Sequence, residues 1–234
     1  MQHIVLDRWA RQTSAVHRFD PRAKLVALLA LLVAVATADR RVPLFGCELL
    51  LFLMAGFAFA RVPLGHAFSR AAIVLPFAAA FVAVMGLNGE AERGLLLAFK
   101  SYISALAVLL VVATTPAPCL LGGLESLGAP RFLLEVAQLL YRYLFLLSEE
   151  AQCMSRAAAA RGIGAGVMER FRAAAGALAV LFARSYVRAE GIHRAMLARG
   201  FAGRLPAMKQ SRFRGADALF LLVASAVPWG LRLL

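Results

Sequence analysis

Charged residues are scarce in this chain of 234 residues, and acidic residues are scarcer than basic ones. Asp, Glu, Lys and Arg together make up 17% of the sequence, whereas hydrophobic residues make up 62%. A soluble domain ordinarily has about 25% charged and about 45–50% apolar residues. The composition, with a mean hydropathy of +0.75, therefore argues against an ordinary soluble protein and indicates an integral membrane protein.

Motifs of the common catalytic and nucleotide-binding sites are also missing. The chain has no G-x-x-x-x-G-K-[ST] phosphate loop, so we expect it to bind no ATP and no other cofactor itself. It contains no H-E-x-x-H, no G-x-S-x-G and no cluster of Cys and His. Its three cysteines are far apart and form no C-x-x-C pair, which suits a reduced compartment or simple core packing. We therefore expect a non-catalytic protein without a metal site.

Five apolar stretches have the length and composition of membrane spans. They cover residues 25–38, 44–60, 71–89, 95–115 and 215–231. A polar loop is expected over residues 61–70, and Pro76, inside the third stretch, is expected to kink its helix. The first is short, but Arg22 and Lys24 can extend it by reaching toward the membrane surface. Asp20-Pro21 before it is typical of a helix start, with Asp20 as N-cap and Pro21 at the first helical position. The sequence thus predicts an all-α integral membrane protein with about five transmembrane helices.

Two charged residues fall within these stretches. Glu48 is either a functional carboxylate inside the membrane or an interfacial residue near a helix start, where the helix dipole favours it. Its place in the first turns after Pro43 favours the interfacial reading. Lys100 lies near the start of the fourth stretch. An intramembrane enzyme that uses Glu48 or Lys100 is an alternative, but the spacing pairs neither with a second catalytic group.

The distribution of Lys and Arg predicts the orientation of the chain. If the basic middle region is cytoplasmic, 21 of the 26 Lys and Arg lie on that side and four on the other. We expect a cytoplasmic N-terminus and three regions: a membrane region (1–118), a cytoplasmic region (119–213) and a last transmembrane helix (214–234). The net charge of +13 also allows a membrane-anchored nucleic-acid binder. Aromatic residues do not interleave with the basic ones as single-strand binding requires, so no nucleic-acid partner is expected.

The middle region contains an unusually long helical pattern, residues 131–160, without Pro or Gly. As one helix it would be about 45 Å long. One polar stripe of alternating charge repeats every seven residues, at Glu135, Arg142, Glu149 and Arg156. The opposite side is apolar, with Leu133, Val136, Leu140, Tyr143, Leu147 and Met154. This pattern predicts an amphipathic helix that lies against the membrane or another helix.

A second long helix is predicted from about 168 to 199, with a basic face that includes Arg184 and Arg188. Its small residues at 173–176 are expected to let another helix approach closely. Both helices end on the same tripeptide, Ala160-Arg161-Gly162 and Ala198-Arg199-Gly200. For a single ending, helix capping is the simpler explanation, because glycine caps a helix and a C-terminal cation favours the dipole. Two identical endings favour a docking role, since the arginine fork binds carboxylates with two hydrogen bonds.

Several of these segments together resemble a known family. They are Asp7-Arg8-Trp9, Asp20-Pro21-Arg22-Ala23-Lys24-Leu25, Leu127-Gly-Ala-Pro-Arg131, Tyr141-Arg142-Tyr143, Glu149-Glu150, Arg156 and the two Ala-Arg-Gly endings. The set is similar to the transmembrane (T) component of energy-coupling factor (ECF) transporters, and it covers essentially the whole chain. The N-terminal segments resemble the CbiQ type, which serves cobalt or nickel uptake.

The resemblance implies a multi-pass subunit of the bacterial inner membrane with three kinds of partner. Two cytoplasmic ABC-type ATPases would bind ATP and grip the helix ends, with Arg161 and Arg199 meeting acidic residues. An integral-membrane S component, CbiM-like and with or without a small CbiN-like subunit, would bind the substrate. The charges expected to support ATPase contact are Glu135, Arg142, Glu149, Arg156, Arg184 and Arg188. A T component shared among vitamin S components is the alternative.

One further pattern concerns metals directly. The free amine, two amides and imidazole of Met1-Gln2-His3 are ligand types that suit Ni(II) or Cu(II) in a square plane. The family resemblance instead implies that the S component selects the metal. We therefore expect no metal site in this chain.

Overall fold

The structure is a computed structural model, and it describes residues 19–37, 42–60, 62–162, 166–203 and 215–233. All regular elements in these ranges are helices, which confirms the all-α expectation for the described residues. The chain divides into two compact units, unit 1 (1–128 and 208–234) and unit 2 (129–207). This division follows packing and not the membrane boundary, so the three regions given above stay predictions.

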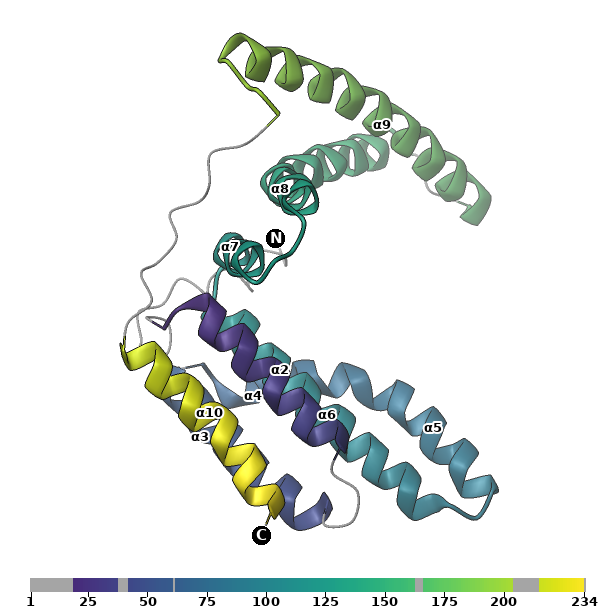
Figure 1. The fold of residues 1–234 in the computed structure, drawn as a ribbon. Coiled ribbons are helices and arrows are strands. Elements are labelled where there is room, and N and C mark those ends of the chain that lie inside the picture. Colours follow the sequence, from purple (N-terminus) through teal and green to yellow (C-terminus); the bar gives the residue numbers. More distant parts are fainter. Residues whose placement is uncertain (1–18, 38–41, 61, 163–165, 204–214, 234) are drawn as a thin grey trace. The chain divides into compact units, whose positions relative to one another are not determined.

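Unit 1 is a bundle built around one central helix, α6 (Ala91–Thr114) (Figure 1). This helix contacts α2 (Pro21–Thr37), α3 (Val42–Ala60), α4 (Leu64–Ala71) and α5 (Leu75–Leu87). Helix α10 (Gly215–Leu233) packs on α2 and α3, and the short α7 (Ala117–Ser126) packs on α2. The last helix of the chain thus lies beside the first one described.

The interior of unit 1 is apolar and closely packed. Its largest fully buried apolar side chains are Phe57, Leu49, Leu53, Ile103 and Leu106. Glycines allow close approach between helices, as membrane helices commonly require. A Cβ on Gly46 would lie 2.1 Å from the Phe99 ring, and one on Gly94 would lie 3.0 Å from Val82 Cα.

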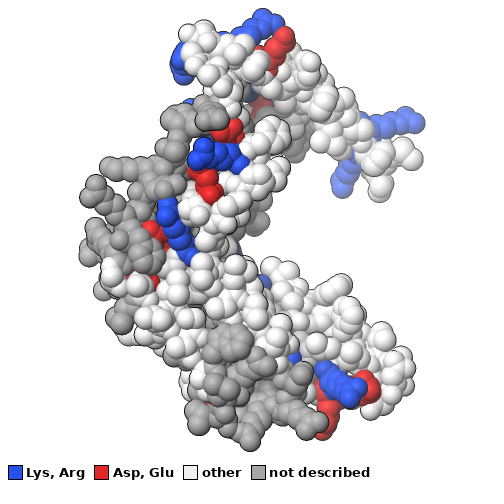
Figure 2. All heavy atoms as spheres, viewed as in Figure 1, with Lys and Arg blue, Asp and Glu red and all other residues white. Residues whose placement is uncertain are grey.

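The outside of unit 1 is also apolar, as expected for a surface that meets lipid. Phe59 and Phe77 are more than 70% exposed, and Leu87 is 89% exposed. Figure 2 shows a largely uncharged surface over this unit, with acidic and basic side chains gathered at the turn between α5 and α6. There Arg93 donates to Glu90 across 2.6 Å. Exposed apolar patches of this extent mark contact with a membrane or a partner.

Two helical stretches in the described part of the chain are long and apolar enough to cross a membrane. They are residues Ala67–Leu87 and Ala91–Thr114. Shorter apolar helices lie at Glu48–Ala60 and Gly215–Ala226. These findings agree with a helical membrane protein, while the total of five spans stays a prediction.

The predicted start of the third span is wrong. A polar loop is expected over residues 61–70, whereas the structure has α4 over Leu64–Ala71. A 3₁₀ turn, Ala72–Val74, then connects α4 to α5 just before Pro76. Because proline supplies no backbone N–H and clashes with the preceding turn, a local change of helix type there is expected. The helix type thus changes just before Pro76, while the kink expected there stays a prediction.

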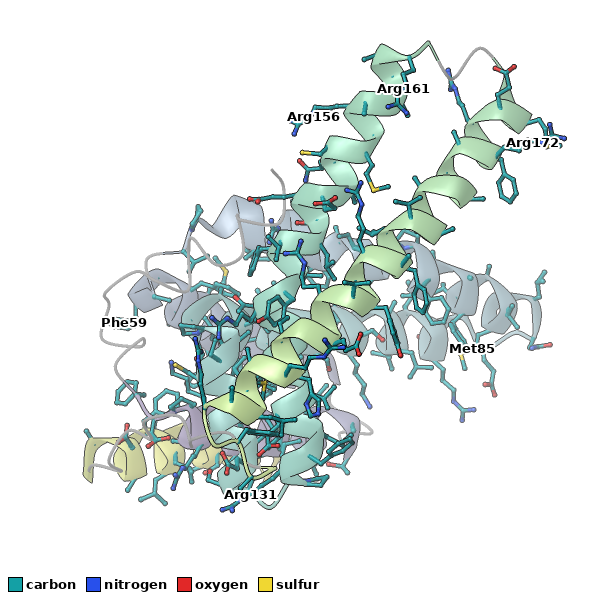
Figure 3. All side chains as sticks on the ribbon, turned by 90° about the horizontal axis from the view of Figure 1, so that it is seen from above. Phe59, Met85, Arg131, Arg156, Arg161 and Arg172 are labelled. Atoms are coloured by element: carbon teal, nitrogen blue, oxygen red, sulfur yellow. The ribbon has the colours of Figure 1, made fainter. Side chains whose placement is uncertain are left out.

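Unit 2 consists of two long helices, α8 (Arg131–Ala160) and α9 (Val167–Ala198), which contact each other (Figure 3). Both predicted helical ranges are confirmed to within one residue. Among the described residues, α8 buries Leu134 alone and α9 buries none. These helices therefore hold their form by their own backbone hydrogen bonds more than by a shared core.

Candidate functional site

The end of α8 is a glycine-capped helix terminus. Arg161 is the C-cap residue, with φ −83° and ψ 5°, and its N–H donates to the Ala157 carbonyl at 3.2 Å. Gly162 follows with φ +71°, a left-handed conformation that glycine adopts without steric cost. Its N–H donates to the Ala159 carbonyl at 3.0 Å. The glycine turns the chain away, so Arg161 is left at the tip of the helix.

The end of α9 has the same construction. Arg199 is the C-cap residue, with φ −90° and ψ 9°, and Gly200 has φ +81°. The Gly200 N–H donates to Leu197 at 2.9 Å, and the Phe201 N–H donates to Met196 at 3.0 Å. These two bonds form the Schellman motif, which satisfies carbonyls at a helix end. Two identical tripeptides thus adopt the same backbone conformation.

Both endings are open to solvent. All six residues of the two tripeptides are exposed: Ala160, Arg161, Gly162, Ala198, Arg199 and Gly200. Within the described ranges, neither guanidinium takes part in an ion pair or a side-chain hydrogen bond. Figure 3 shows Arg161 at the end of α8. Each arginine therefore presents its full set of five donors for a partner.

The six charged residues expected to support ATPase contact differ in exposure and in their contacts. Glu135 is half-buried, and the others are exposed: Arg142, Glu149, Arg156, Arg184 and Arg188. Arg184 forms an ion pair with Glu150, which joins α9 to α8. The Arg142 guanidinium lies 5.9 Å from the Tyr143 ring centroid, and Arg156 Nη2 donates to Cys153 Sγ at 3.2 Å. Arg184 therefore has a role inside the unit that the sequence did not indicate.

A groove of about 660 Å³ separates parts of the two helices. Alanines and one serine form most of its walls, with Ala151, Ser155, Ala158 and Ala159 on α8 and Ala173, Ala174 and Ala177 on α9. The sequence predicted that small residues near 173–176 permit close approach of a helix. In the structure, Ala173 and Ala174 line this groove together with residues of α8.

A buried polar cluster in unit 1 was not recognised from the sequence. Lys24, 2% exposed, donates from Nζ to the Thr114 carbonyl at 3.1 Å and to Thr115 Oγ1 at 2.9 Å. Asp217 Oδ1 accepts from the Asp20 N–H at 2.9 Å. The expectation that Lys24 reaches toward the membrane surface is therefore wrong. Its partners lie 90 and 91 residues away, a distance at which sequence spacing gives no signal.

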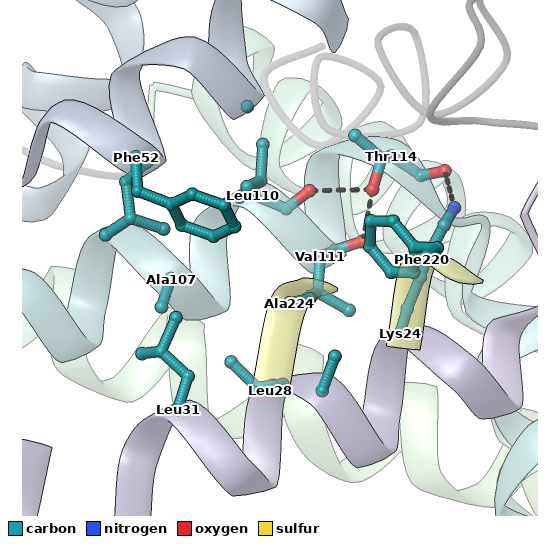
Figure 4. A pocket seen from close by; sticks show the side chains of 13 residues that line it. Lys24, Leu28, Leu31, Phe52, Ala107, Leu110, Val111, Thr114, Phe220 and Ala224 are labelled. Carbon is teal, nitrogen blue, oxygen red and sulfur yellow. Dashed lines mark hydrogen bonds between the residues drawn. The ribbon is translucent and has the colours of Figure 1, made fainter. Parts of the chain in front are cut away.

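The N-cap at the start of α2 is confirmed. Asp20 Oδ1 accepts a hydrogen bond from the Arg22 N–H at 2.9 Å, as a carboxylate before a helix should. An apolar cavity of about 100 Å³ adjoins Lys24 and is walled by residues such as Leu28, Phe52 and Phe220 (Figure 4). The polar cluster thus lies beside an apolar space.

The other candidate residues do not assemble into a site. Glu48 is exposed on α3, and Lys100 Nζ lies 3.5 Å from the Ala36 carbonyl oxygen. Within the described ranges, no group of three or more His, Cys, Asp or Glu could hold a metal. The Met1-Gln2-His3 pattern lies outside those ranges.

Comparisons with known proteins point in one direction. Residues 12–210 match the CbiQ family, described as cobalt transport protein. The energy-coupling factor transporter transmembrane protein EcfT of Bacillus selenitireducens is 30% identical, over 96% of each chain. EcfT of Bacillus subtilis is 26% identical, over 87% of this chain and 86% of its own. The cobalt transport protein CbiQ of Rhodobacter capsulatus is 38% identical, over 41% of this chain and 39% of its own.

Proposed function

This chain belongs to the CbiQ family, and from that membership we propose how it works as the transmembrane component of an energy-coupling factor transporter. It couples two cytoplasmic ABC-type ATPases to a membrane-embedded S component that binds the substrate. The ATPases bind and hydrolyse ATP. This chain transmits their movement.

The observation that carries the proposal is the matched geometry of the two helix ends. Arg161 and Arg199 occupy the same position before glycines with φ +71° and φ +81°, and both are exposed. Two equivalent endings suit two equivalent or related ATPases, with one ending bound to each. Carboxylates in a groove of each ATPase would accept the planar guanidinium, and the absence of a glycine side chain lets that groove approach the backbone.

The two helices behind these endings act as levers. When ATP binding draws the ATPases together, the two helix ends move with them. Because α8 and α9 share so little buried surface with each other, their crossing can change without disrupting a packed core. The exposed apolar residues of α8, such as Leu133 and Leu140, offer the S component a surface to bind.

The proposed topology has about five spans, with the N-terminus in the cytoplasm of a bacterium and the chain in the inner membrane. The two long apolar stretches, the two shorter apolar helices and α2 supply these spans. The bias of Lys and Arg toward residues 131–214 supports a cytoplasmic position for α8 and α9.

Cobalt is the substrate we propose, with nickel as the chemically nearest alternative. The support is the CbiQ description of the matching family and the name of the Rhodobacter capsulatus relative. A CbiM-like S component, with or without a CbiN-like subunit, would then bind the metal. The EcfT relatives keep a shared vitamin transporter as the second candidate. The chain itself we propose to be non-catalytic, since it has no phosphate loop.

Charge reversal at both helix ends tests this function. We expect Arg161→Glu with Arg199→Glu to lower recovery of the ATPases about a hundredfold or more, since disrupting a buried hydrogen-bonded charge pair costs about 2–5 kcal/mol. The measurement is co-purification of the two ATPases from membranes, followed by uptake of Co²⁺. The purified chain alone is the background sample and should hydrolyse no ATP.

Arg172→Glu is the control, because Arg172 is exposed on α9 and belongs to neither tripeptide. It changes the net charge as much as either charge reversal does by itself, and it should leave ATPase recovery nearly unchanged. Full recovery with the double variant, or an equal loss with the control, would contradict the docking role of the two endings.

A further inference from the structure

A buried lysine holds the corner at which the central helix of unit 1 gives way to α7. Lys24 lies in the first turn of α2, while Thr114 is the last residue of α6 and Thr115 is its C-cap. Pro116 then begins α7 as its N-cap. By bonding to the Thr114 carbonyl and the Thr115 hydroxyl, the ammonium group fixes the α6–α7 corner against α2.

Because this cation is buried, its surroundings must supply hydrogen bonds and opposite charge. Moving an ammonium group out of water costs free energy unless the group is hydrogen-bonded and paired with an opposite charge. The carboxylates of Asp20 and Asp217 lie near enough to attract it, and both are buried. Since Asp217 belongs to α10, the cluster ties the ends of α2, α6 and α10 together.

Helix α7 has a second attachment to the same part of α2. A Cβ added to Gly123 would lie 3.2 Å from Pro21 Cβ and 3.1 Å from Leu25 Cδ1. The two helices therefore touch closely at Gly123. Helix α7 ends at Ser126, and α8 begins at Arg131, so only residues 127–130 connect them. Helix α7 is thus the covalent link between the bundle and α8.

We propose that Lys24 is a positioning residue for energy coupling. By holding the α6–α7 corner on α2, it fixes the point from which α8 moves. Motion delivered at Arg161 and Arg199 then reaches the membrane helices and is not lost in a displacement of α7. This inference rests on the proposed coupling function, and it concerns a residue that touches neither nucleotide nor substrate.

The first test measures the attachment of α7 in the full chain without partners. In detergent, amide hydrogen exchange of residues 117–126 should become about tenfold faster in Lys24→Met, because local opening of α7 becomes easier. Lys24→Arg, which keeps a cation and donors, should retain most of the protection. Unchanged exchange in Lys24→Met would overturn the proposal.

A milder pair of variants covers the case in which Lys24→Met does not fold. Thr115→Val removes the hydroxyl acceptor and keeps the shape of the side chain, whereas Thr115→Ser keeps the hydroxyl. Faster exchange of α7 in the valine variant alone is expected. Equal exchange in the two variants would then overturn the proposal.

The second test measures coupling in the assembled transporter. The Lys24→Met complex should recover its ATPases and hydrolyse ATP at a near-normal rate, but take up severalfold less Co²⁺ for each ATP hydrolysed. A merely structural role would lower the amount of complex and both rates together. An unchanged ratio of Co²⁺ uptake to ATP hydrolysis would overturn the coupling role.

A disulfide between α2 and α7 tests whether restoring their attachment restores coupling in Lys24→Met. Cysteines at positions 21 and 123, in a Cys119→Ser background, have the Cβ separation of a disulfide after a shift of a few tenths of an ångström. Oxidation should restore the uptake ratio in Lys24→Met, and a lock that forms without restoring it would count against the idea. If the unaltered chain recovers no ATPase, the proposed function fails, and if it takes up no Co²⁺, the proposed substrate fails. In either case, hydrogen exchange still decides whether Lys24 holds α7.

Discussion

Unit 1 and unit 2 are built from the same chain by different means. Unit 1 buries large side chains from several helices in one interior, including Leu53 of α3 and Ile103 of α6. In unit 2, the described part of α8 and α9 buries one side chain, Leu134. The two helices are joined by a few contacts and one ion pair, Arg184 with Glu150.

This difference shows in which unit the side chains themselves fix the relative positions of the helices. The helices of unit 1 are held in place by interlocking side chains and close glycine contacts. Helices of 30 and 32 residues can form from local backbone hydrogen bonds, but those bonds do not fix the angle between two helices. The crossing of α8 and α9 is therefore weakly specified within the unit, as the proposed coupling role would require.

The largest expected contrast is between truncations of a large apolar side chain in the two units. Leu53→Ala should lower the free energy of unfolding by about 2–5 kcal/mol, because it opens a cavity in a packed interior. Phe182→Ala, at a side chain 74% exposed on α9, should change it by no more than about 0.5 kcal/mol. Denaturant unfolding of the purified chain in detergent measures both. Equal losses would mean that unit 2 has an interior of its own.

Glycine substitutions should act in opposite directions in the two units. A Cβ on Gly94 would meet Val82 Cα at 3.0 Å and Met85 Cβ at 3.3 Å, so Gly94→Ala should destabilise unit 1 by about 1–3 kcal/mol. Gly176 in α9 has no atom within 4 Å of an added Cβ. Gly176→Ala should therefore stabilise α9 by up to about 1 kcal/mol through helix propensity. The same unfolding experiment, with hydrogen exchange of α9, checks both signs, and a stabilising Gly94→Ala would refute the close contact.

The smallest expected effect concerns the ion pair between α8 and α9. A double-mutant cycle with Glu150→Gln and Arg184→Gln should give a coupling energy below about 1 kcal/mol, since the Arg184 side chain is 61% exposed. High salt should reduce it further. A larger, salt-insensitive coupling would show that this pair, and not a partner, sets how the two helices cross.

The sequence predicted local features well and long-range ones poorly. The range of α8 follows from Pro130, Gly162 and thirty residues without a helix breaker, all of which act within a few residues. The start of the third span was missed because residues 64–70 are polar enough to resemble a loop, while tertiary packing on α6 makes them a helix. Lys24 was misread for a similar reason, since only the fold brings Thr114 and Thr115 to it.

The two helix endings were recognised because the same tripeptide occurs twice. Their identity of backbone conformation could be inferred from glycine at C′. Their solvent exposure could not, because exposure depends on packing around the ends. The pairing of Arg184 with Glu150 was likewise beyond the sequence, since it depends on how two helices cross.

The sparse interior of α8 and α9 also bears on the abundance of the protein in the cell. Apolar side chains such as Phe171, Phe182 and Val187 are about 70% exposed. A copy synthesised in excess of its partner subunits would leave these side chains uncovered, and such surfaces attract quality-control proteases. Unassembled copies should therefore be short-lived, so that the supply of partners limits how much of this subunit accumulates.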